Sequence, residues 1–97
     1  MKQIDRKLLE EFCAKHSIKR LSLYGSALSG GFLEGKSDYD ILAEFEPENA
    51  PDLFEFSGME LELSEKLGVK VDLKTPGDLS KYFVDDVMRK AKPLYER

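Results

Sequence analysis

Hydrophobic positions in the first half of the chain follow two different periods. Apolar side chains recur at helical spacing over about residues 4 to 16, with charged residues between them, which predicts an amphipathic helix. Residues 18 to 24 and 39 to 46 alternate instead between apolar and polar side chains, as strands with one buried face do. Between these strands, Ser26 is suited to cap a short helix, and the glycine-rich residues 29 to 37 predict a loop.

The second half of the chain predicts a helix, a strand and another helix in turn. A second amphipathic helix ends at Gly68, and its apolar positions are Leu53, Phe56, Met59, Leu63 and Leu67. Residues 69 to 74 alternate as a third strand, residues 75 to 77 form a turn, and residues 79 to 90 predict a last helix that buries Tyr82 or Phe83. This order predicts an α/β (α+β) fold, a small mixed β-sheet flanked by helices, as one domain over residues 1–97.

Composition narrows the function of this domain. A formal net charge of −4 and a pI of about 5.0 lack the basic excess of nucleic-acid-binding domains, so direct nucleic-acid binding is not expected. The single cysteine, Cys13, cannot form an internal disulfide and is expected in the core. No apolar run approaches the roughly 18 residues of a membrane span, so we expect a soluble, cytoplasmic protein with no membrane partner.

Three aspartates form the strongest chemical pattern. Asp38 and Asp40 stand two residues apart at the start of the second predicted strand, so their side chains share one face. Neighbouring carboxylates repel each other unless a cation lies between them, and Mg²⁺ binds such hard oxygen ligands together with phosphate. Asp72 lies on the polar side of the third strand and can join them if the two strands are neighbours. Three clustered carboxylates suit two metal ions, one to activate a hydroxyl and one to hold a triphosphate.

The turn after the first strand adds a phosphate-binding feature. Gly25 and Ser26 stand where the predicted strand ends and a helix is expected to begin. Free backbone N–H groups at such a turn bind phosphate with the help of the helix dipole, and glycine permits a close approach. We therefore expect Gly25 and Ser26 to bind the phosphates of a nucleotide, beside the magnesium site.

A competing motif overlaps the predicted loop. Residues 30 to 37 match the P-loop pattern G-x-x-x-x-G-K-[ST], which would make Lys36 a phosphate ligand and Ser37 a magnesium ligand. That pattern has meaning only between a strand and a following helix. The segment that follows here, residues 39 to 46, has the period of a strand, so we reject the P-loop interpretation.

Other notable side chains have simpler explanations. His16, at the end of the first helix, is expected to cap that helix or to lie on the surface. Glu44 and Glu46 extend the polar side of the second strand toward solvent. Phe54 and Phe56 are expected in the core, and the alternative is that one of them is exposed for a partner.

These motifs together resemble the minimal nucleotidyltransferases of the DNA polymerase β superfamily. The resemblance covers nearly the whole chain and implies the polymerase β-type nucleotidyltransferase fold. It rests on Leu23-Tyr24-Gly25-Ser26, then Ser37-Asp38-Tyr39-Asp40-Ile41-Leu42, then Val71-Asp72-Leu73, and the tail Lys92-Pro93-Leu94-Tyr95-Glu96 is similar to the end of these proteins.

The resemblance assigns a role to each motif. In that family the Gly-Ser turn binds the triphosphate, the Asp-x-Asp pair binds magnesium, and a third acid completes the metal site and helps to deprotonate the acceptor. By match, nucleotide binding falls on Gly25 and Ser26. Metal binding and catalysis fall on Asp38, Asp40 and Asp72, with two Mg²⁺ ions as cofactors and ATP as substrate.

The resemblance also implies a partner. Many minimal nucleotidyltransferases are antitoxins of HEPN-type toxins, and some transfer AMP from ATP to a toxin tyrosine, so the same activity and partner are expected here. One departure stands out, because Ala27 and Leu28 follow the Gly-Ser pair where the family often has arginine. This departure keeps open the alternative of a non-catalytic antitoxin, a binding module that neutralises a toxin by direct contact.

Overall fold

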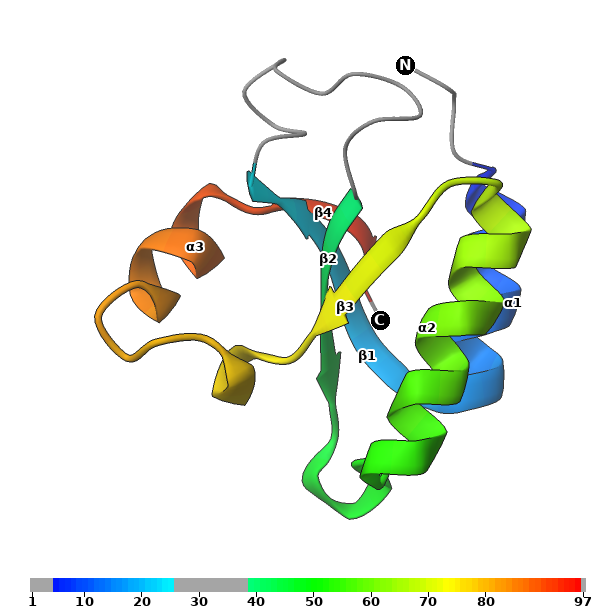
Figure 1. Ribbon diagram of the computed structural model, residues 1–97, viewed down its shortest axis with the longest axis horizontal. Coiled ribbons are helices and arrows are strands. Elements are labelled where there is room, and N and C mark those ends of the chain that lie inside the picture. Colours follow the sequence, from blue (N-terminus) through cyan, green and yellow to red (C-terminus); the bar gives the residue numbers. More distant parts are fainter. Residues whose placement is uncertain (1–4, 26–38, 97) are drawn as a thin grey trace.

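The computed structural model describes residues 5–25 and 39–96 of the 97-residue chain. The predicted α/β character with a small mixed sheet is confirmed (Figure 1). In chain order the elements are α1 (Arg6–His16), β1 (Ile18–Tyr24), β2 (Tyr39–Phe45), the 3-10 turn η2 (Pro47–Asn49), α2 (Leu53–Leu67), β3 (Val71–Lys74), the 3-10 turn η3 (Pro76–Asp78), α3 (Val84–Lys90) and β4 (Lys92–Glu96).

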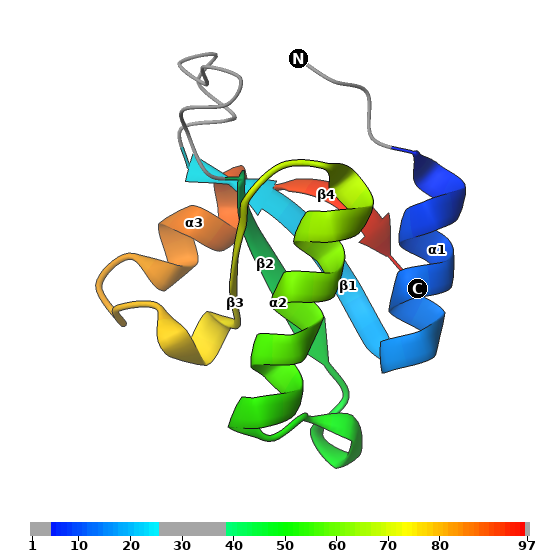
Figure 2. The ribbon, with the colours of Figure 1, turned by 45° about the vertical axis from the view of Figure 1, so that its right-hand side comes forward.

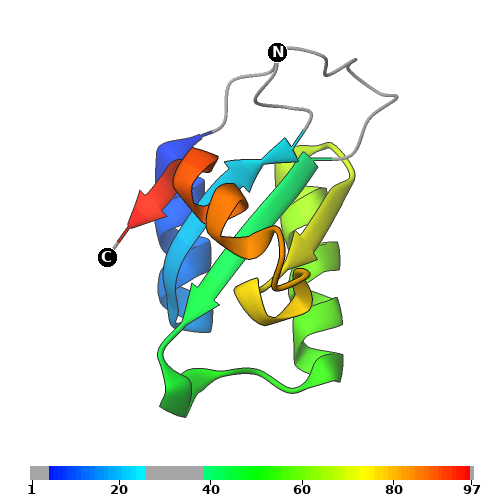
Figure 3. The same ribbon diagram turned by 90° about the vertical axis from the view of Figure 1, so that its left-hand side faces the viewer.

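The sheet has the strand order β3-β2-β1-β4. Strand β2 runs parallel to β3 and antiparallel to β1, and β1 runs antiparallel to β4. Helices α1 and α2 pack side by side on one face of the sheet, whereas η3 and α3 lie on the opposite face (Figures 1 to 3). Strands β2 and β3 are thus neighbours, which was the condition under which Asp72 could lie beside Asp40.

The core lies between the sheet and the pair α1 and α2. Side chains of β1 and β2 alternate between this core and the opposite face, because successive residues of a strand point to opposite sides. The core-facing pairs are Leu21 with Ala43 and Leu23 with Ile41. The other large buried side chains include Leu9, Phe12, Cys13, Tyr39, Met59, Leu63, Val71 and Leu73. The expected core position of Cys13 is therefore confirmed, and burial raises the pKa of its thiol to about 12.

Local chemistry fixes both ends of α2. Asp52 accepts a hydrogen bond from the Glu55 backbone N–H, and Glu55 accepts one from the Asp52 backbone, which forms a capping box. Gly68 ends the helix with a φ of 71°, in the left-handed region that favours glycine. Gly58 lies inside this helix, where nothing requires a glycine: a Cβ built on it would meet no atom within 4 Å.

We expect Gly58→Ala to stabilise the protein by about 0.5–1 kcal/mol, because alanine has less conformational freedom to lose in a helix. Urea denaturation measures the free energy of unfolding. Gly68→Ala is the matched control, and it should destabilise by about 1–2 kcal/mol because of its left-handed backbone. A loss of stability in Gly58→Ala would contradict the described environment of that residue.

The two long helices are joined by a polar contact at the end of α1. The Nε2 atom of His16 lies 3.0 Å from Oε1 of Glu62, and Lys15 Nζ lies 3.2 Å from the same carboxylate. Burial raises the pKa of Glu62, but the hydrogen bonds from His16 and Lys15 outweigh it and hold the pKa below its ordinary value of 4.5. His16 thus lies near the surface at a helix end, as the sequence predicted, and pairs with α2.

This contact predicts a pH dependence of stability. Because the folded pKa of Glu62 is lowered, its contribution is present above about pH 4.5 and is lost as the pH falls through the folded pKa. When the pH falls from 6 to 3.5, the free energy of unfolding should therefore decrease less in Glu62→Gln than in wild type. The two decreases should differ by less than about 1 kcal/mol, because the ion pair is partly exposed. Urea denaturation at both pH values measures this difference. Glu65→Gln, on the exposed side of α2, should match the wild-type pH dependence.

The predicted last helix is wrong over its first half. Helix α3 begins only at Val84, so the predicted residues 79 to 83 are not helical, and the residues before them, 76 to 78, form the 3-10 turn η3. The backbone N–H and hydroxyl of Thr75 both donate to the Asp78 carboxylate at 3.1 Å, which closes this turn. Tyr82 and Phe83 are exposed, at 81% and 65% of their surface, where burial of one of them was expected. Both residues precede α3, and within α3 itself no residue is fully buried.

Strand β4 was not predicted from the sequence pattern. It pairs with β1, with Leu21 opposite Tyr95 and Ser22 opposite Pro93. Its five residues are too few to show a clear alternation, and proline has no N–H to donate, which confines it to edge strands such as this one. Other boundaries differ by one or two residues, with β2 ending at Phe45 and β3 beginning at Val71. No helix in the described part of the chain is long and apolar enough to cross a membrane.

Candidate functional site

One row of polar side chains crosses three strands on the face opposite α1 and α2. In the strand register Tyr24 of β1 is opposite Asp40 of β2, and Asp40 is opposite Asp72 of β3. Directly opposite residues of adjacent strands point to the same face, with Cβ atoms about 5 Å apart. All three side chains are half-buried. We call Tyr24, Asp40 and Asp72 the acidic row, and Figure 3 shows the face on which it lies.

Gly25 lies against the carboxylate of Asp40. Its φ of 79° is in the left-handed region, and a Cβ built on it would lie 2.5 Å from Oδ2 of Asp40. Real Cβ atoms do not approach an oxygen so closely, so any other residue would have to displace the carboxylate. Gly25, directly after β1, and Asp40, near the start of β2, are thus in direct contact, and the glycine backbone is left accessible beside Asp40.

Tyr24 places a protonated hydroxyl near the carboxylates. Burial, followed by the negative charges of Asp40, Asp72 and Asp78, raises the pKa of Tyr24 to about 12. The phenol therefore keeps its proton at neutral pH and remains a hydrogen-bond donor. The sequence indicated only indirectly that Tyr24 lies on this face, because Tyr24 alternates in step with the polar residues Arg20 and Ser22 of β1.

Lys74 brings a positive charge to the same face. Its Nζ atom lies 3.5 Å from Oδ1 of Asp72, and both side chains are partly exposed. Lysine and aspartate two residues apart on one strand share a face, so this pair was recognisable from spacing, although we had not predicted it. This positive charge is notable because Ala27 and Leu28, not arginine, follow Gly25 and Ser26 in the sequence.

Two predicted site residues lie outside the described part of the chain. These are Ser26 and Asp38, together with the P-loop-like residues 30 to 37. Of the remaining predictions, Gly25, Asp40 and Asp72 are brought together by β1, β2 and β3. Over residues 5–25 and 39–96 no group of three or more His, Cys, Asp or Glu side chains could hold a metal ion.

The residues that are described suit a magnesium–phosphate ligand. Two opposed carboxylates supply hard oxygen atoms, and their mutual repulsion is relieved when a divalent cation binds between them. The missing Cβ of Gly25 leaves room beside Asp40 for a group that contacts the backbone. The described residues thus place two carboxylates and an accessible glycine backbone together at the strand ends.

Comparison with known proteins identifies the family. Residues 5–94 match the profile described as the nucleotidyltransferase domain. The chain belongs to the nucleotidyltransferase domain family. The prediction of this family and of a transferase activity is thereby confirmed, since the match covers nearly the whole chain.

A curated relative points in the same direction. A Methanocaldococcus jannaschii protein, provisionally named a protein adenylyltransferase, is 37% identical to this nucleotidyltransferase over 79 residues. The aligned part covers 81% of this chain and 74% of the relative. A second M. jannaschii protein with the same provisional name is 34% identical over 84 residues.

Solved structures share the fold. A structure described as a minimal nucleotidyltransferase has a TM-score of 0.74 at 31% identity, and the match covers 91% of this chain and 87% of that one. A toxin–antitoxin structure with AMP-PNP has a TM-score of 0.77 at 19% identity, covering 97% and 75%. A complex of a tri-AMPylated Shewanella oneidensis HEPN toxin with its MNT antitoxin has a TM-score of 0.70 at 18% identity, covering 100% and 74%. The resemblance to minimal nucleotidyltransferases is thus confirmed, and the last two matches show the fold.

Proposed function

We propose that this nucleotidyltransferase transfers AMP from ATP to a tyrosine hydroxyl of a partner HEPN-type toxin, in a magnesium-dependent reaction, and thereby acts as its antitoxin. The observation that carries this proposal is the contact of Gly25 with Asp40, which itself faces Asp72. Related proteins support it, because one relative is provisionally named a protein adenylyltransferase and one fold neighbour is bound to an AMPylated toxin.

Each residue assigned to the site has a role in the proposed reaction. Gly25 and the adjoining Ser26 bind the phosphates of ATP through the turn after β1. Asp40, with Asp38 and Asp72, would hold Mg²⁺. When bound, the metal neutralises phosphate charge and makes the acceptor hydroxyl easier to deprotonate. Most of the rate would come from this positioning and charge stabilisation.

The bond changes of the transfer are simple. The acceptor oxygen forms a new bond to the α-phosphorus of ATP, and the bond between that phosphorus and the β-phosphate oxygen breaks, so that pyrophosphate leaves. The proton of the acceptor hydroxyl passes to the carboxylate of Asp72. Lys74 lies 3.5 Å from Asp72 and so places a positive charge beside that carboxylate.

A second function is supported by one specific observation. Lys74 Nζ lies 3.5 Å from Oδ1 of Asp72 and competes with a metal ion for that oxygen, in a chain that lacks the arginine the family often has after the Gly-Ser pair. A domain with such a site could neutralise a toxin by contact alone, without transferring a nucleotide. The two functions differ in whether the partner gains mass.

Mass spectrometry of the partner separates the two functions. The protein is mixed with a HEPN-type protein encoded beside it, ATP and Mg²⁺, and an AMP adduct on a tyrosine of the partner is expected. Chelation of the metal with EDTA should abolish the adduct, and added Mg²⁺ should restore it. Suppression of toxicity without any adduct on the partner would replace the transferase proposal by the contact mechanism.

A further inference from the structure

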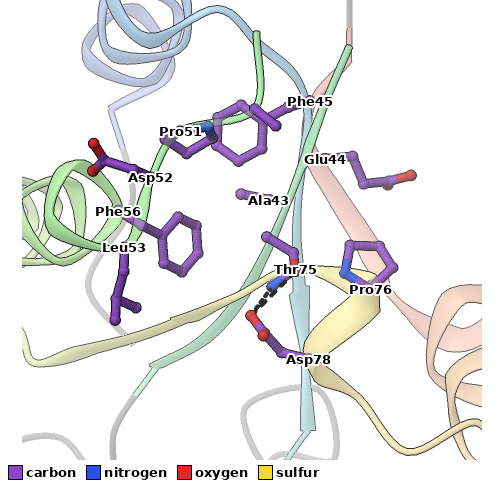
Figure 4. Close-up of a pocket in the computed structure, with 11 residues that line it drawn as sticks. Ala43, Glu44, Phe45, Pro51, Asp52, Leu53, Phe56, Thr75, Pro76 and Asp78 are labelled. Atoms are coloured by element: carbon purple, nitrogen blue, oxygen red, sulfur yellow. Dashed lines mark hydrogen bonds between the residues drawn. The ribbon is translucent and has the colours of Figure 1, made fainter. Parts of the chain in front are cut away.

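A pocket of about 500 Å³ opens at the end of β2 that lies farthest from the acidic row (Figure 4). It lies between the last residues of β2, the start of α2 and the turn η3. Its apolar lining includes Ala43, Phe45, Pro51, Leu53, Phe56 and Pro76. The proposed reaction uses none of these residues, so the pocket needs a separate explanation.

Aromatic side chains give the pocket a firm wall. The rings of Phe45 and Phe56 meet edge to face, with centroids 6.3 Å apart, and both pack against the core. At the mouth, Leu53 exposes 76% of its surface, and the adjacent Phe54 exposes 88%. Of the two phenylalanines expected in the core, Phe56 is half-buried and Phe54 is exposed. Large apolar side chains clustered in this way at the rim of a hollow mark binding surfaces.

The end of β2 borders this pocket. Strand β3 ends at Lys74, which is opposite Leu42 in the register. The chain then turns away, because Thr75 bonds to Asp78 within η3. Ala43 and Phe45 therefore extend beyond the last residue of β3 and line the pocket. Ala43 is fully buried, whereas Glu44 and Phe45 are half-buried, so the last two residues of β2 offer the strand edge with which an extended peptide segment could form backbone hydrogen bonds.

The rim of the pocket is acidic. Among the described residues, its charged lining residues are Glu44, Asp52 and Asp78, and neither His16 nor any of the described lysines and arginines lines it. Glu44 is paired with Arg20 at 3.7 Å, whereas the recorded hydrogen-bond donors to Asp52 and Asp78 are uncharged N–H and O–H groups. In the described part of the chain, no lysine, arginine or histidine is paired with either of the last two carboxylates. Such a rim attracts a cationic ligand and repels phosphate groups.

We propose that this pocket is a docking site for an extended segment of a partner protein, in which one bulky apolar side chain is flanked by lysine or arginine. The apolar side chain fills the hollow beside Phe56, the backbone runs along the end of β2, and the basic residues face Asp52 and Asp78. This docking site goes beyond the transfer reaction, since it serves equally a partner that receives AMP and one that is only bound.

Random nonapeptides displayed on phage test the proposal with the full chain as bait. Peptides that combine an aromatic or branched apolar residue with lysine or arginine should be enriched over an unrelated bait. Synthetic copies should bind in a fluorescence polarisation assay and should weaken as salt is raised. Binding should also shift the backbone amide resonances of Ala43 and Phe45.

A matched pair of variants locates the binding surface. Leu53→Gln should weaken peptide binding at least about tenfold, because the leucine side chain loses its buried contact with the peptide. Leu61→Gln is the control, since Leu61 lies on the same helix with 66% exposure and does not line the pocket. It should bind within about twofold of wild type.

Several outcomes would overturn the docking site. One is the absence of enrichment over the unrelated bait, and another is equal binding by wild type and Leu53→Gln. Enrichment of acidic peptides would contradict the charge argument. Displacement of the peptides by ATP without metal would assign the pocket to the nucleotide base instead. None of these outcomes depends on whether AMP is transferred, so docking and catalysis can fail separately.

Discussion

Asp40→Asn is expected to lower AMP transfer to the partner by at least about a hundredfold while the protein stays folded. Asparagine has nearly the shape of aspartate but lacks the charge that a divalent cation needs. Asp40 occupies the middle of the acidic row, between Tyr24 and Asp72, so its charge is central to the proposed metal site. The measurement is the initial rate of AMP addition to the partner, followed by intact-protein mass spectrometry.

Controls separate the loss of charge from a loss of fold. Asp85→Asn makes the same chemical change on the exposed surface of α3 and should leave the rate unchanged. Circular dichroism and thermal unfolding should show that Asp40→Asn is folded. Asp72→Asn should lose activity as well, because Asp72 is proposed to take the proton of the acceptor. If Asp40→Asn retained the wild-type rate, the metal site assigned to the acidic row would be wrong.

Gly25→Ala is expected to reduce both stability and transfer. The left-handed backbone at Gly25 alone should cost about 1–2 kcal/mol for alanine. The new Cβ would also lie 2.5 Å from the Asp40 carboxylate and would have to push it out of place. Because Asp40 is proposed to bind the metal, the rate should fall at least about tenfold, even at temperatures where the variant is fully folded.

A double-mutant cycle divides this effect into its two causes. In the Asp40→Ala background the carboxylate is gone, so Gly25→Ala should cost only the backbone strain and less than in wild type. Urea denaturation of the four proteins gives the difference. Gly77→Ala serves as control, because its nearest neighbour would be the Thr75 hydroxyl oxygen at 3.8 Å. An equal cost of Gly25→Ala in both backgrounds would show that the close approach to Asp40 does not exist.

Hydrophobic periodicity predicted the elements that pack against the core. Strand β1 matches the predicted residues 18 to 24, and α2 ends before Gly68 as expected, because in both cases one apolar side is fully buried. The same reasoning failed for α3, whose apolar residues are only partly covered. It also failed for β4, because a short edge strand with a proline leaves little periodic signal.

The site was predictable to the extent that it depends on strand phase. The positions of Asp40 and Asp72 on the polar side of their strands follow from alternation, and only their adjacency required the parallel pairing of β2 and β3. The contact of Gly25 with Asp40 could not be predicted, because it depends on how the end of β1 meets β2 in space. The pocket beside Phe56 was hidden for the same reason, since three separate segments form it.

The strand order also has a consequence for synthesis of the chain on the ribosome. Strand β1 carries Tyr24 and leads into Gly25, yet its second edge is covered only when β4 has been made. Until then a nascent chain exposes the open edge of its central strand, which is a template for pairing with other chains. The nascent protein is therefore most vulnerable to aggregation just before residues 92–96 emerge, and deletion of those residues would make that state permanent.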